Sequence, residues 1–271
     1  MEYKLPQREE ISNKSTYGKV LNIAGSDYMP GAAYLSSVSA LKVGCGYCFL
    51  CSTDRVINAI CSQTQNVVFA PIKDLKSQIK NADVIEIGCG LGQNSLSKKI
   101  FNDFIKYTPV EKPVIVDADG LNLISQDPQK FIKKGFKNVI FTPHPKEAAR
   151  LLYVDDVLEN IEEAAKLISE KYNCVTVLKT HKTYIYSPEG RQYTNTTGNN
   201  ALAKAGSGDV LTGIIAGLCA QGMDLFEASC LGVHLHGLCA DIAIEELTQY
   251  CVMANDLINY LPSAIKKIIE N

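Results

Sequence analysis

Short apolar runs alternate with segments of helical periodicity along most of this chain, and this alternation is the strongest constraint on its fold. Strands that alternate with helices are typical of βαβ units, which build a mainly parallel sheet covered by helices on both faces. The predicted strands are KVLNIAG (19–25), YCFLCST (47–53), NVVFAP (66–71), DVIEIG (83–88), PVIVDA (113–118), NVIFTP (138–143) and CVTVLK (174–179). The predicted helices between them lie at 32–43, 94–107, 145–152 and 157–172. We therefore expect an α/β fold.

The pattern within and after these runs refines that expectation. The runs are apolar throughout instead of alternating, as in strands that are buried on both faces. Beyond Lys179, the segment TYIYSPEGRQYTN predicts an antiparallel hairpin that turns at Pro188–Glu189–Gly190. From about Gly206 to Ile269 the pattern is nearly all helical. Because no linker, repeat or change in composition marks a boundary, we expect one domain over residues 1–271.

The composition favours a small-molecule partner over nucleic acid or a membrane. The 271 residues include 27 basic and 29 acidic side chains, so there is no excess of positive charge to bind nucleic acid. The N-terminal segment is charged and lacks the apolar stretch of a signal peptide, and the apolar runs elsewhere are too short to span a bilayer. Most of the ten cysteines lie inside apolar runs, as buried thiols do in a reducing compartment. We expect a cytoplasmic protein.

One group of cysteines needs a separate interpretation. Cys45, Cys48 and Cys51 have a spacing that iron–sulfur ligands also use. If the segment is a strand, however, side chains three residues apart point to opposite faces and cannot converge on one metal. We therefore interpret these cysteines as small core residues.

Glycines collect just beyond the predicted strands. In an open α/β sheet, ligands bind in the crevice outside the carboxyl ends of the strands, where the main chain must approach the ligand closely. A single glycine there is as easily a plain turn, but several clusters in one chain favour a binding site. The glycines concerned are Gly25, Gly31, Gly88, Gly90, Gly92, Gly120, Gly198, Gly206 and Gly208.

The most informative segment is NTTGNNALAKAGSGDVLTGIIAGLCAQG, residues 195–222. Its Gly206–Ser207–Gly208–Asp209 turn directly precedes an apolar run with helical spacing, so the glycines mark a helix N-terminus. Unpaired N–H groups and the positive end of the helix dipole make such a position an anion-binding site. Two roles are open for Asp209: a capping carboxylate, or a general base beside that anion site. The flanking glycines favour the second role.

With these residues, the chain resembles the ADP/ATP-dependent NAD(P)H-hydrate dehydratases, a branch of the ribokinase-like superfamily. The GxGD turn is typical of the whole superfamily, whereas FTPHPKEAARLL (141–152) combined with the NTTGN and LAKAGSGDVLTG segments is specific to this branch. Further matching stretches are VLNIAGSDYMPGAAYLSSVSALKVGCG (20–46), ADVIEIGCGLG (82–92), VIVDADGLN (114–122), VLKTHKTYIYSPEGRQYTNTTGN (177–199) and MANDLINYLP (253–262). The resemblance implies a ribokinase-like three-layer sandwich.

The resemblance also implies site residues and partners. For the hydrated dinucleotide, NADHX or NADPHX, it implies contacts with Ala32, Ala33, Gly90, Gly92, His144 and Asp209. For ADP or ATP it implies Lys179, Thr180, His181, Lys182, Thr183, Asn199 and Gly208. The catalytic group implied is Asp209 with the glycine turn, Gly206 and Gly208. The family further implies Mg²⁺, for which we assign no protein ligand, and a homo-oligomer, suspected to be a tetramer.

Three positions depart from the family pattern. Thr180 stands where the family usually has glycine, Cys89 where it usually has proline, and Asn255 where serine is customary. The first departure bears on the fit of the nucleotide, and no consequence is assigned to the third.

Several neighbouring residues keep two interpretations. His144, held between two prolines, is either a ligand contact or a rigid structural histidine. Asp117 and Asp119 share one face of a strand end and orient the nucleotide site, bind Mg²⁺ or cap the next turn. Lys179 either reaches phosphates or is a solvated strand-end lysine. Residues two apart in a helix point to different faces, so we do not expect His234 and His236 to bind one metal ion together.

The activity that the resemblance implies is a dehydration through phosphorylation. Asp209 would take the proton of the ring hydroxyl as it attacks the terminal phosphoryl group, after which phosphate leaves and NADH or NADPH is restored. Two other functions remain open from the sequence. One is a kinase of the same superfamily that phosphorylates a vitamin precursor or sugar, and the other is a nucleotide sensor without catalysis.

Overall fold

The computed structural model describes residues 3–270, and all of its strands lie in one sheet with the order β3-β2-β1-β4-β5-β6-β7-β8-β9. The pairs from β3 to β7 are parallel, and β8 and β9 are antiparallel additions at one edge. The strands are β1 (Lys19–Ile23), β2 (Tyr47–Ser52), β3 (Val68–Pro71), β4 (Val84–Ile87), β5 (Val114–Val116), β6 (Val139–Phe141), β7 (Val175–Lys179), β8 (Thr183–Tyr186) and β9 (Gln192–Thr194).

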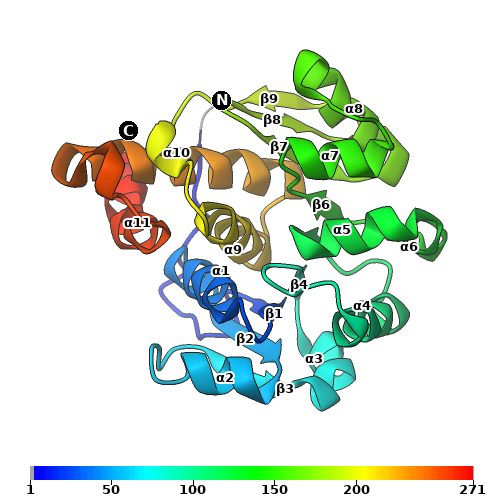
Figure 1. The fold of residues 1–271 in the computed structure, drawn as a ribbon. Coiled ribbons are helices and arrows are strands. Elements are labelled where there is room, and N and C mark those ends of the chain that lie inside the picture. The colour runs from blue at the N-terminus through cyan, green and yellow to red at the C-terminus, as the bar shows by residue number, and fades with distance from the viewer. Residues whose placement is uncertain (1–2, 271) are drawn as a thin grey trace.

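Helices cover both faces of this sheet, which gives three layers (Figure 1). One face carries α1 (Pro30–Lys42), α2 (Asp54–Ile60), α9 (Ser207–Ala220), α10 (Leu225–Cys251) and α11 (Ala254–Ile269). The other face carries α3 (Leu75–Asn81), α4 (Ser95–Tyr107), α5 (Asp119–Gln126), α6 (Pro128–Lys134), α7 (Pro145–Leu152) and α8 (Ile161–Tyr172). Short 3₁₀ turns lie at Ile72–Asp74, Leu158–Asn160 and Asn200–Leu202. No helix within residues 3–270 is both long and apolar enough to cross a membrane.

The seven predicted strands of the parallel part and the predicted hairpin are confirmed. Their apolar residues pack on both faces of the sheet, in three clusters of buried residues. Val20, Val84 and Ile115 face α9 and α10, whereas Leu21, Ile85 and Val114 face α3 to α5. Strands with buried side chains on both faces are what continuous apolar runs predict. The predicted helices are also confirmed, with the 157–172 segment divided into a 3₁₀ turn and α8.

Four helices were not predicted from the sequence: α2, α3, α5 and α6. Each has only seven or eight residues, about two turns, so each offers few apolar repeats, although α7 with eight residues was predicted. Two of them begin at a recognisable signal, since Thr53 caps α2 and Pro128 starts α6.

The cysteines of the CGYCFLC segment are core residues, as the strand pattern indicates. Cys48 and Cys51 lie in β2 with fully buried side chains, and Cys45 precedes the strand and is also buried. In the part of the chain that the structure describes, they belong to no group of side chains able to hold a metal ion.

The order of the strands places the candidate site. The chain builds β1, β2 and β3 toward one edge, then returns to add β4 on the other side of β1. Between β1 and β4 the connections leave in opposite directions, and ligands bind at such a switch point in open α/β sheets. The loops after both strands meet there, since Gly25 N–H donates to the Cys89 carbonyl at 2.8 Å.

Helix α9, which begins at this switch point, packs closely against α1. A methyl group added at Gly213 would lie 2.1 Å from the Ser36 carbonyl oxygen, and one at Gly217 would lie 2.4 Å from a Val43 methyl group. The two glycines are one turn apart on the face of α9 that meets α1, so they let the two backbones approach. This contact sets the height of the α9 N-terminus above the sheet.

We predict that Gly213→Ala lowers the free energy of unfolding by about 1–3 kcal/mol, because an overpacked helix contact forces the backbones apart. The matched control is Gly31→Ala, also a helical glycine, where an added methyl group meets nothing within 4 Å. That control should be neutral or slightly stabilising. Urea unfolding of both variants measures the difference, and equal effects would show that the α1–α9 contact tolerates side chains.

Candidate active site

The glycine turn forms the start of α9, as predicted. Gly206 is the N-cap with a φ of 92°, a left-handed conformation that favours glycine, and the helix begins at Ser207. His236 Nε2 donates to the Ser207 carbonyl at 2.9 Å, which ties the turn to α10. The first N–H groups of α9 have no partner within the helix and carry the positive end of its dipole. The turn is therefore built as an anion-binding helix N-terminus.

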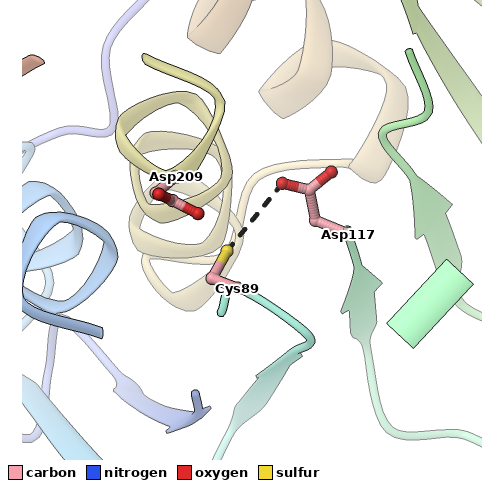
Figure 2. A group of neighbouring side chains, drawn as sticks. All are labelled: Cys89, Asp117 and Asp209. Carbon is pink, nitrogen blue, oxygen red and sulfur yellow. Dashed lines mark hydrogen bonds between the residues drawn. The ribbon is translucent and has the colours of Figure 1, made fainter. Parts of the chain in front are cut away.

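Asp209 lies in the first turn of α9 with a partly exposed side chain. Burial and then the nearby Asp117 carboxylate raise the pKa of Asp209 to about 6. The capping position belongs to Gly206. The Asp209 carboxylate lies instead beside the Cys89 thiol, within 4.8 Å of its sulfur, and that thiol donates to Asp117 Oδ2 (Figure 2). A partly exposed carboxylate whose pKa lies close to neutral pH is suited to general-base chemistry.

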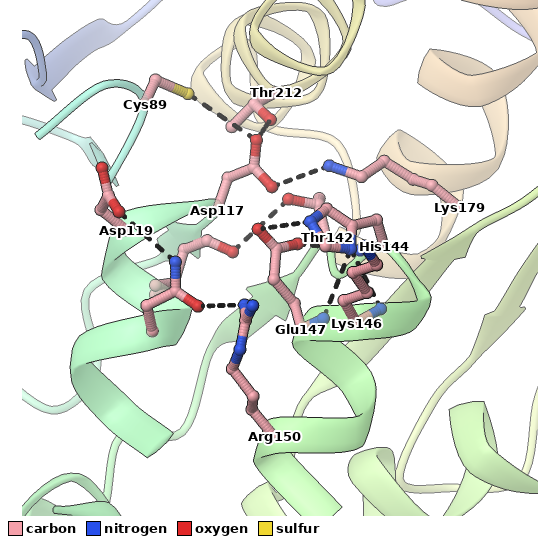
Figure 3. A network of polar contacts seen from close by, with 12 residues as sticks. Cys89, Asp117, Asp119, Thr142, His144, Lys146, Glu147, Arg150, Lys179 and Thr212 are labelled. Carbon is pink, nitrogen blue, oxygen red and sulfur yellow. Dashed lines mark hydrogen bonds and ion pairs between the residues drawn. The ribbon is translucent and has the colours of Figure 1, made fainter. Parts of the chain in front are cut away.

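A buried ion pair lies beside Gly208. Lys179 Nζ is 2.8 Å from Asp117 Oδ1, and the Thr212 hydroxyl donates to Asp117 Oδ2 at 2.9 Å (Figure 3). A methyl group added at Gly208 would lie 3.3 Å from Lys179 Nζ. The side chain of Lys179 is only 20% exposed, which excludes the alternative of a solvated strand-end lysine. The site thus holds a positive charge directly under the glycine turn.

Asp117 and Asp119 do not share one face, and that interpretation was wrong. The strand ends at Val116, and Ala118 between the two aspartates has a φ of 48° and a ψ of −116°, so the alternation of a strand does not continue. Asp119 Oδ2 accepts from the Gly92 N–H at 2.7 Å. The first aspartate holds Lys179, and the second positions the glycine loop after β4.

His144 is the N-cap of α7, and it forms a capping box with Glu147. Its Nδ1 accepts from the N–H groups of Lys146 and Glu147, and the Glu147 carboxylate accepts from the His144 N–H at 2.8 Å. Burial and Lys179 lower the pKa of His144, so the neutral ring carries its proton on Nε2. The ring is nearly half exposed, so His144 combines a structural role with an accessible edge.

The substrate-side residues implied by the family meet at the switch point. Gly90 has a φ of 61°, and a methyl group added there would lie 2.7 Å from the Ala32 methyl group, so the loop after β4 touches the first turn of α1. Gly92 adjoins this loop and Ala32 is partly exposed. The side chain of Ala33 is fully buried, so only its main chain is placed to meet a ligand.

Most nucleotide-side residues line one cleft of about 420 Å³ between the β7–β8 turn and α10. Thr180, His181, Thr183 and Asn199 are in its wall, together with the His236–Gly237 pair of α10, which also matches the family pattern. The other predicted nucleotide-side residues are not in the wall of this cleft. Lys179 and Gly208 are neighbours of each other, and Lys182 is exposed in the β7–β8 turn. Thr180 does not have a positive φ, so the turn tolerates threonine in place of the usual glycine.

A second cleft of about 690 Å³ lies on the other side of the glycine turn, between the starts of α1 and α11. Gly31, Tyr34, Lys204 and Asn255 are in its wall. The departure at Asn255 therefore falls on a cavity surface, which the sequence alone did not indicate. The segment from Ala203 to Ala205 separates the two clefts.

Cys89, Asp117 and Asp209 have ligand atoms within 4.8 Å of one another, the single such group among residues 3–270 (Figure 2). This group does not fit Mg²⁺, which requires hard oxygen ligands in an octahedron. One of its members is a buried thiol, and both oxygens of Asp117 already have partners in Lys179 and Thr212. We therefore assign no protein ligand to magnesium.

The sequence did not indicate the roles of Thr212, Glu147 or Asp241. Thr212 follows Gly208 by one helical turn, and Glu147 follows His144 by the spacing of a capping box. The spacing in the sequence could therefore have indicated both residues. Asp241 accepts from Gly198 N–H and from the Asn199 side chain, each at 2.9 Å. Its partners lie more than forty residues away, so no local pattern could identify it.

The fold and site define a ribokinase-like protein. A ribokinase-like superfamily protein from Enterococcus faecalis V583 superposes with a TM-score of 0.90 and 28% identity, over 97% of this chain and 92% of that one. An ADP/ATP-dependent NAD(P)H-hydrate dehydratase from Bacillus subtilis, co-crystallised with ATP and Mg²⁺, superposes with a TM-score of 0.84 and 33% identity, over 97% and 94%. A hydroxyethylthiazole kinase from Pyrococcus horikoshii, at 14% identity and a TM-score of 0.68, shares the fold alone.

The particular family follows from the sequence match. The family described as NAD(P)H-hydrate dehydratase matches residues 20–263, so the chain belongs to that family. The ADP-dependent (S)-NAD(P)H-hydrate dehydratase of Neisseria meningitidis is 40% identical over 88% of this chain and 81% of its own length. A bifunctional NAD(P)H-hydrate repair enzyme of Thermofilum pendens is 35% identical over 98% of this chain. This chain spans about half the length of that bifunctional relative, 53%.

We predict that Lys179→Met lowers the free energy of unfolding by about 3–5 kcal/mol, because it leaves the buried Asp117 carboxylate without its counter-ion. Adding Asp117→Asn to that variant should restore part of the loss. Lys182→Met, at an exposed position in the adjacent turn, is the control and should change stability by less than about 0.5 kcal/mol. Urea unfolding measures all three, and a small effect of Lys179→Met would contradict the ion pair.

Proposed function

We propose that this protein is an ADP- or ATP-dependent dehydratase that converts the S form of hydrated NADH or NADPH back to NADH or NADPH. The observation that carries the proposal is the juxtaposition of the partly exposed Asp209 carboxylate with the anion-binding start of α9 and the Lys179 ammonium group. A base, an anion site and a fixed positive charge are what phosphoryl transfer to a hydroxyl requires. The family relationship supplies the substrate.

In the proposed reaction, the hydroxyl oxygen of the hydrated ring attacks the terminal phosphoryl group of the nucleotide. Asp209 accepts the hydroxyl proton while the N–H groups of the glycine turn stabilise the charge on the transferring group. The bond from that phosphorus to the bridging oxygen breaks, and ADP leaves from ATP or AMP leaves from ADP. The lone pair of the ring nitrogen then expels phosphate, which breaks the C–O bond and leaves an iminium ion. Loss of a proton from the neighbouring ring carbon to water forms the ring C=C bond and restores the dihydronicotinamide.

The first cleft and the neighbouring switch point support a division of the site between the partners. The adenine nucleotide would occupy the cleft lined by Thr180, His181, Thr183 and Asn199, with its terminal phosphate at Gly208 and Lys179. The hydrated dinucleotide would lie on the α1 side, against Ala32, Gly90 and Gly92, with His144 at its edge. Mg²⁺ would accompany the nucleotide as counter-ion of its phosphates. A cytoplasmic location and a homotetramer complete the proposal, and sedimentation of the purified protein tests the assembly.

The direct test is to incubate hydrated NADH with the protein and either ADP or ATP. Return of the reduced-nicotinamide absorbance together with release of phosphate supports the dehydratase. A stable phosphorylated product with no phosphate release would identify a kinase instead. Absence of any nucleotide-dependent turnover would favour a sensor.

We predict that Asp209→Asn lowers turnover by about 10²- to 10⁴-fold, the usual contribution of a general base. Binding of ADP should be nearly unchanged, because the anion site consists of main-chain groups. Stopped assays of turnover and titration calorimetry with ADP separate the two effects. Turnover close to that of the wild type would exclude the proposed role of Asp209.

The pH dependence provides a second test of the same residue. Because the pKa of Asp209 is raised to about 6, its carboxylate is ionised above that pH and protonated below it. We predict that kcat/KM falls about tenfold per pH unit below pH 6 in the wild type. The residual rate of Asp209→Asn should lack this acid limb, and an unchanged limb in the variant would assign it to another group.

A further inference from the structure

Glu86 is a carboxyl group buried beneath the candidate site, with no counter-ion. It lies in the middle of β4 and its side chain is 0% exposed. No ion pair involves Glu86 in the described part of the chain. An isolated carboxylate in such a place is costly, and a buried carboxyl group usually remains neutral instead.

The two oxygens of Glu86 have very different surroundings. Oε1 lies 3.6 Å from the Cys89 sulfur, whereas Oε2 is buried without a hydrogen-bond partner. Asn22 lies directly opposite Glu86 in the register of β1 and β4, and its Oδ1 is also buried without a partner. The Asn22 amide is oriented by donation from Nδ2 to the hydroxyl oxygens of Ser36 and Ser37, at 2.7 and 2.9 Å.

One proton accounts for both unpartnered oxygens. Residues opposite each other on adjacent strands are about 5 Å apart and project to the same face. Two acceptor oxygens in that position would repel one another, and both would remain without a hydrogen bond in a buried place, which is unfavourable. A hydrogen on Glu86 Oε2 changes the pair into a donor and an acceptor.

The balance of charges in the site also indicates that Glu86 is the neutral carboxyl group. Glu86, Asp117 and Asp209 surround the Cys89 thiol, and Lys179 is the cation that contacts this group. If all three carboxyl groups were ionised, the largely buried site would carry two uncompensated negative charges. Asp117 has Lys179 and Thr212 as partners, and Asp209 is partly exposed. Glu86 is therefore the group that is least able to remain charged.

The titratable groups that face Glu86 raise its pKa further. Burial is the main cause, followed by the charges of Asp117 and Asp209, and the pKa of Glu86 is raised to about 8. The thiol of Cys89 partly offsets the increase. The thiols of Cys45 and Cys48 approach from the β2 side, and burial raises their own pKa, so both are neutral.

We propose that Glu86 carries a proton at neutral pH and that, through the Cys89 thiol, it positions the Asp209 carboxylate; Glu86 is a positioning residue. The thiol has one hydrogen, and three carboxyl groups lie around it. The thiol contacts Glu86 Oε1 and Asp117 Oδ2 at 3.6 and 3.8 Å, and Asp209 lies within 4.8 Å of the sulfur. When Glu86 is neutral, its Oε1 is a weak acceptor, so the thiol hydrogen is available to the other two carboxylates, Asp209 among them. When Glu86 is ionised, it attracts that hydrogen and adds a negative charge beneath the base. The link requires Cys89, the position at which this chain departs from the usual proline of the family.

The first experiment measures the proton itself and requires no turnover. Infrared difference spectra of wild type minus Glu86→Gln at pH 7 should contain the C=O band of a protonated carboxylic acid, and the band should disappear near pH 9.5. Absence of the band at pH 7 overturns the proposal. Because the measurement does not depend on the substrate, it separates this proposal from the proposed dehydratase function on which the positioning role rests.

The second experiment measures the consequence for activity. We predict that the wild type loses turnover between pH 7 and pH 9, by at least fivefold, and that Glu86→Gln, which cannot ionise, keeps the ratio of the two rates within about twofold. Cys89→Ala should also flatten this alkaline limb, because it removes the link to Asp209. Glu111→Gln, at an exposed position far along the sheet, is the matched control and should behave as the wild type. An alkaline limb that persists unchanged in Glu86→Gln would overturn the positioning role.

The pH dependence of unfolding by urea tests the protonation of Glu86 even in variants that have lost activity. The pKa of Glu86 is raised from 4.5 to about 8 in the folded state, so its favourable contribution is complete below pH 4.5 and is lost as the pH rises through 8. The unfolding midpoint of the wild type should therefore fall relative to that of Glu86→Gln between pH 5 and pH 8. Parallel midpoints over this range would contradict a raised pKa.

Discussion

The contact between the Asp117 carboxylate and the Lys179 ammonium group is the interaction on which the candidate site depends. It joins the end of β5 to the end of β7, and Thr212 of α9 donates to the same carboxylate. One side chain thus connects two strands and the helix whose N-terminus forms the anion site (Figure 3). A buried charge that lost its partner would be strongly unfavourable, so these elements keep a fixed arrangement.

The same concentration of charge explains the raised pKa values around the site. The pKa values of three carboxyl groups are raised: to about 6 for Asp209, about 7 for Glu147 and about 8 for Glu86. Burial is the main cause for each of them. Lys179 opposes the increase in pKa for Asp209 and Glu147, whereas the Cys89 thiol opposes it for Glu86. Groups with perturbed pKa values gather at functional sites because catalysis requires them.

The three departures from the family pattern have different physical consequences. Thr180 fits its turn without a positive φ, so the usual glycine is not required by the backbone here. Asn255 lies in the wall of the second cleft, where it changes a surface that a ligand would meet. Cys89 places a hydrogen-bonding thiol among three carboxyl groups.

The sequence by itself determined the strands, the long helices, the α9 glycine turn and the family, because these depend on periodicity and on residues close together in the chain. Only the tertiary structure decided which side chains meet at the switch point. Lys179 lies 62 residues from Asp117, and Thr212 lies 95 residues from it, so no local pattern relates them. The pairing of Asn22 with Glu86 likewise depends on the register of β1 against β4. Contacts of this kind form when separate elements pack, and the resulting burial then sets the charge state of each group.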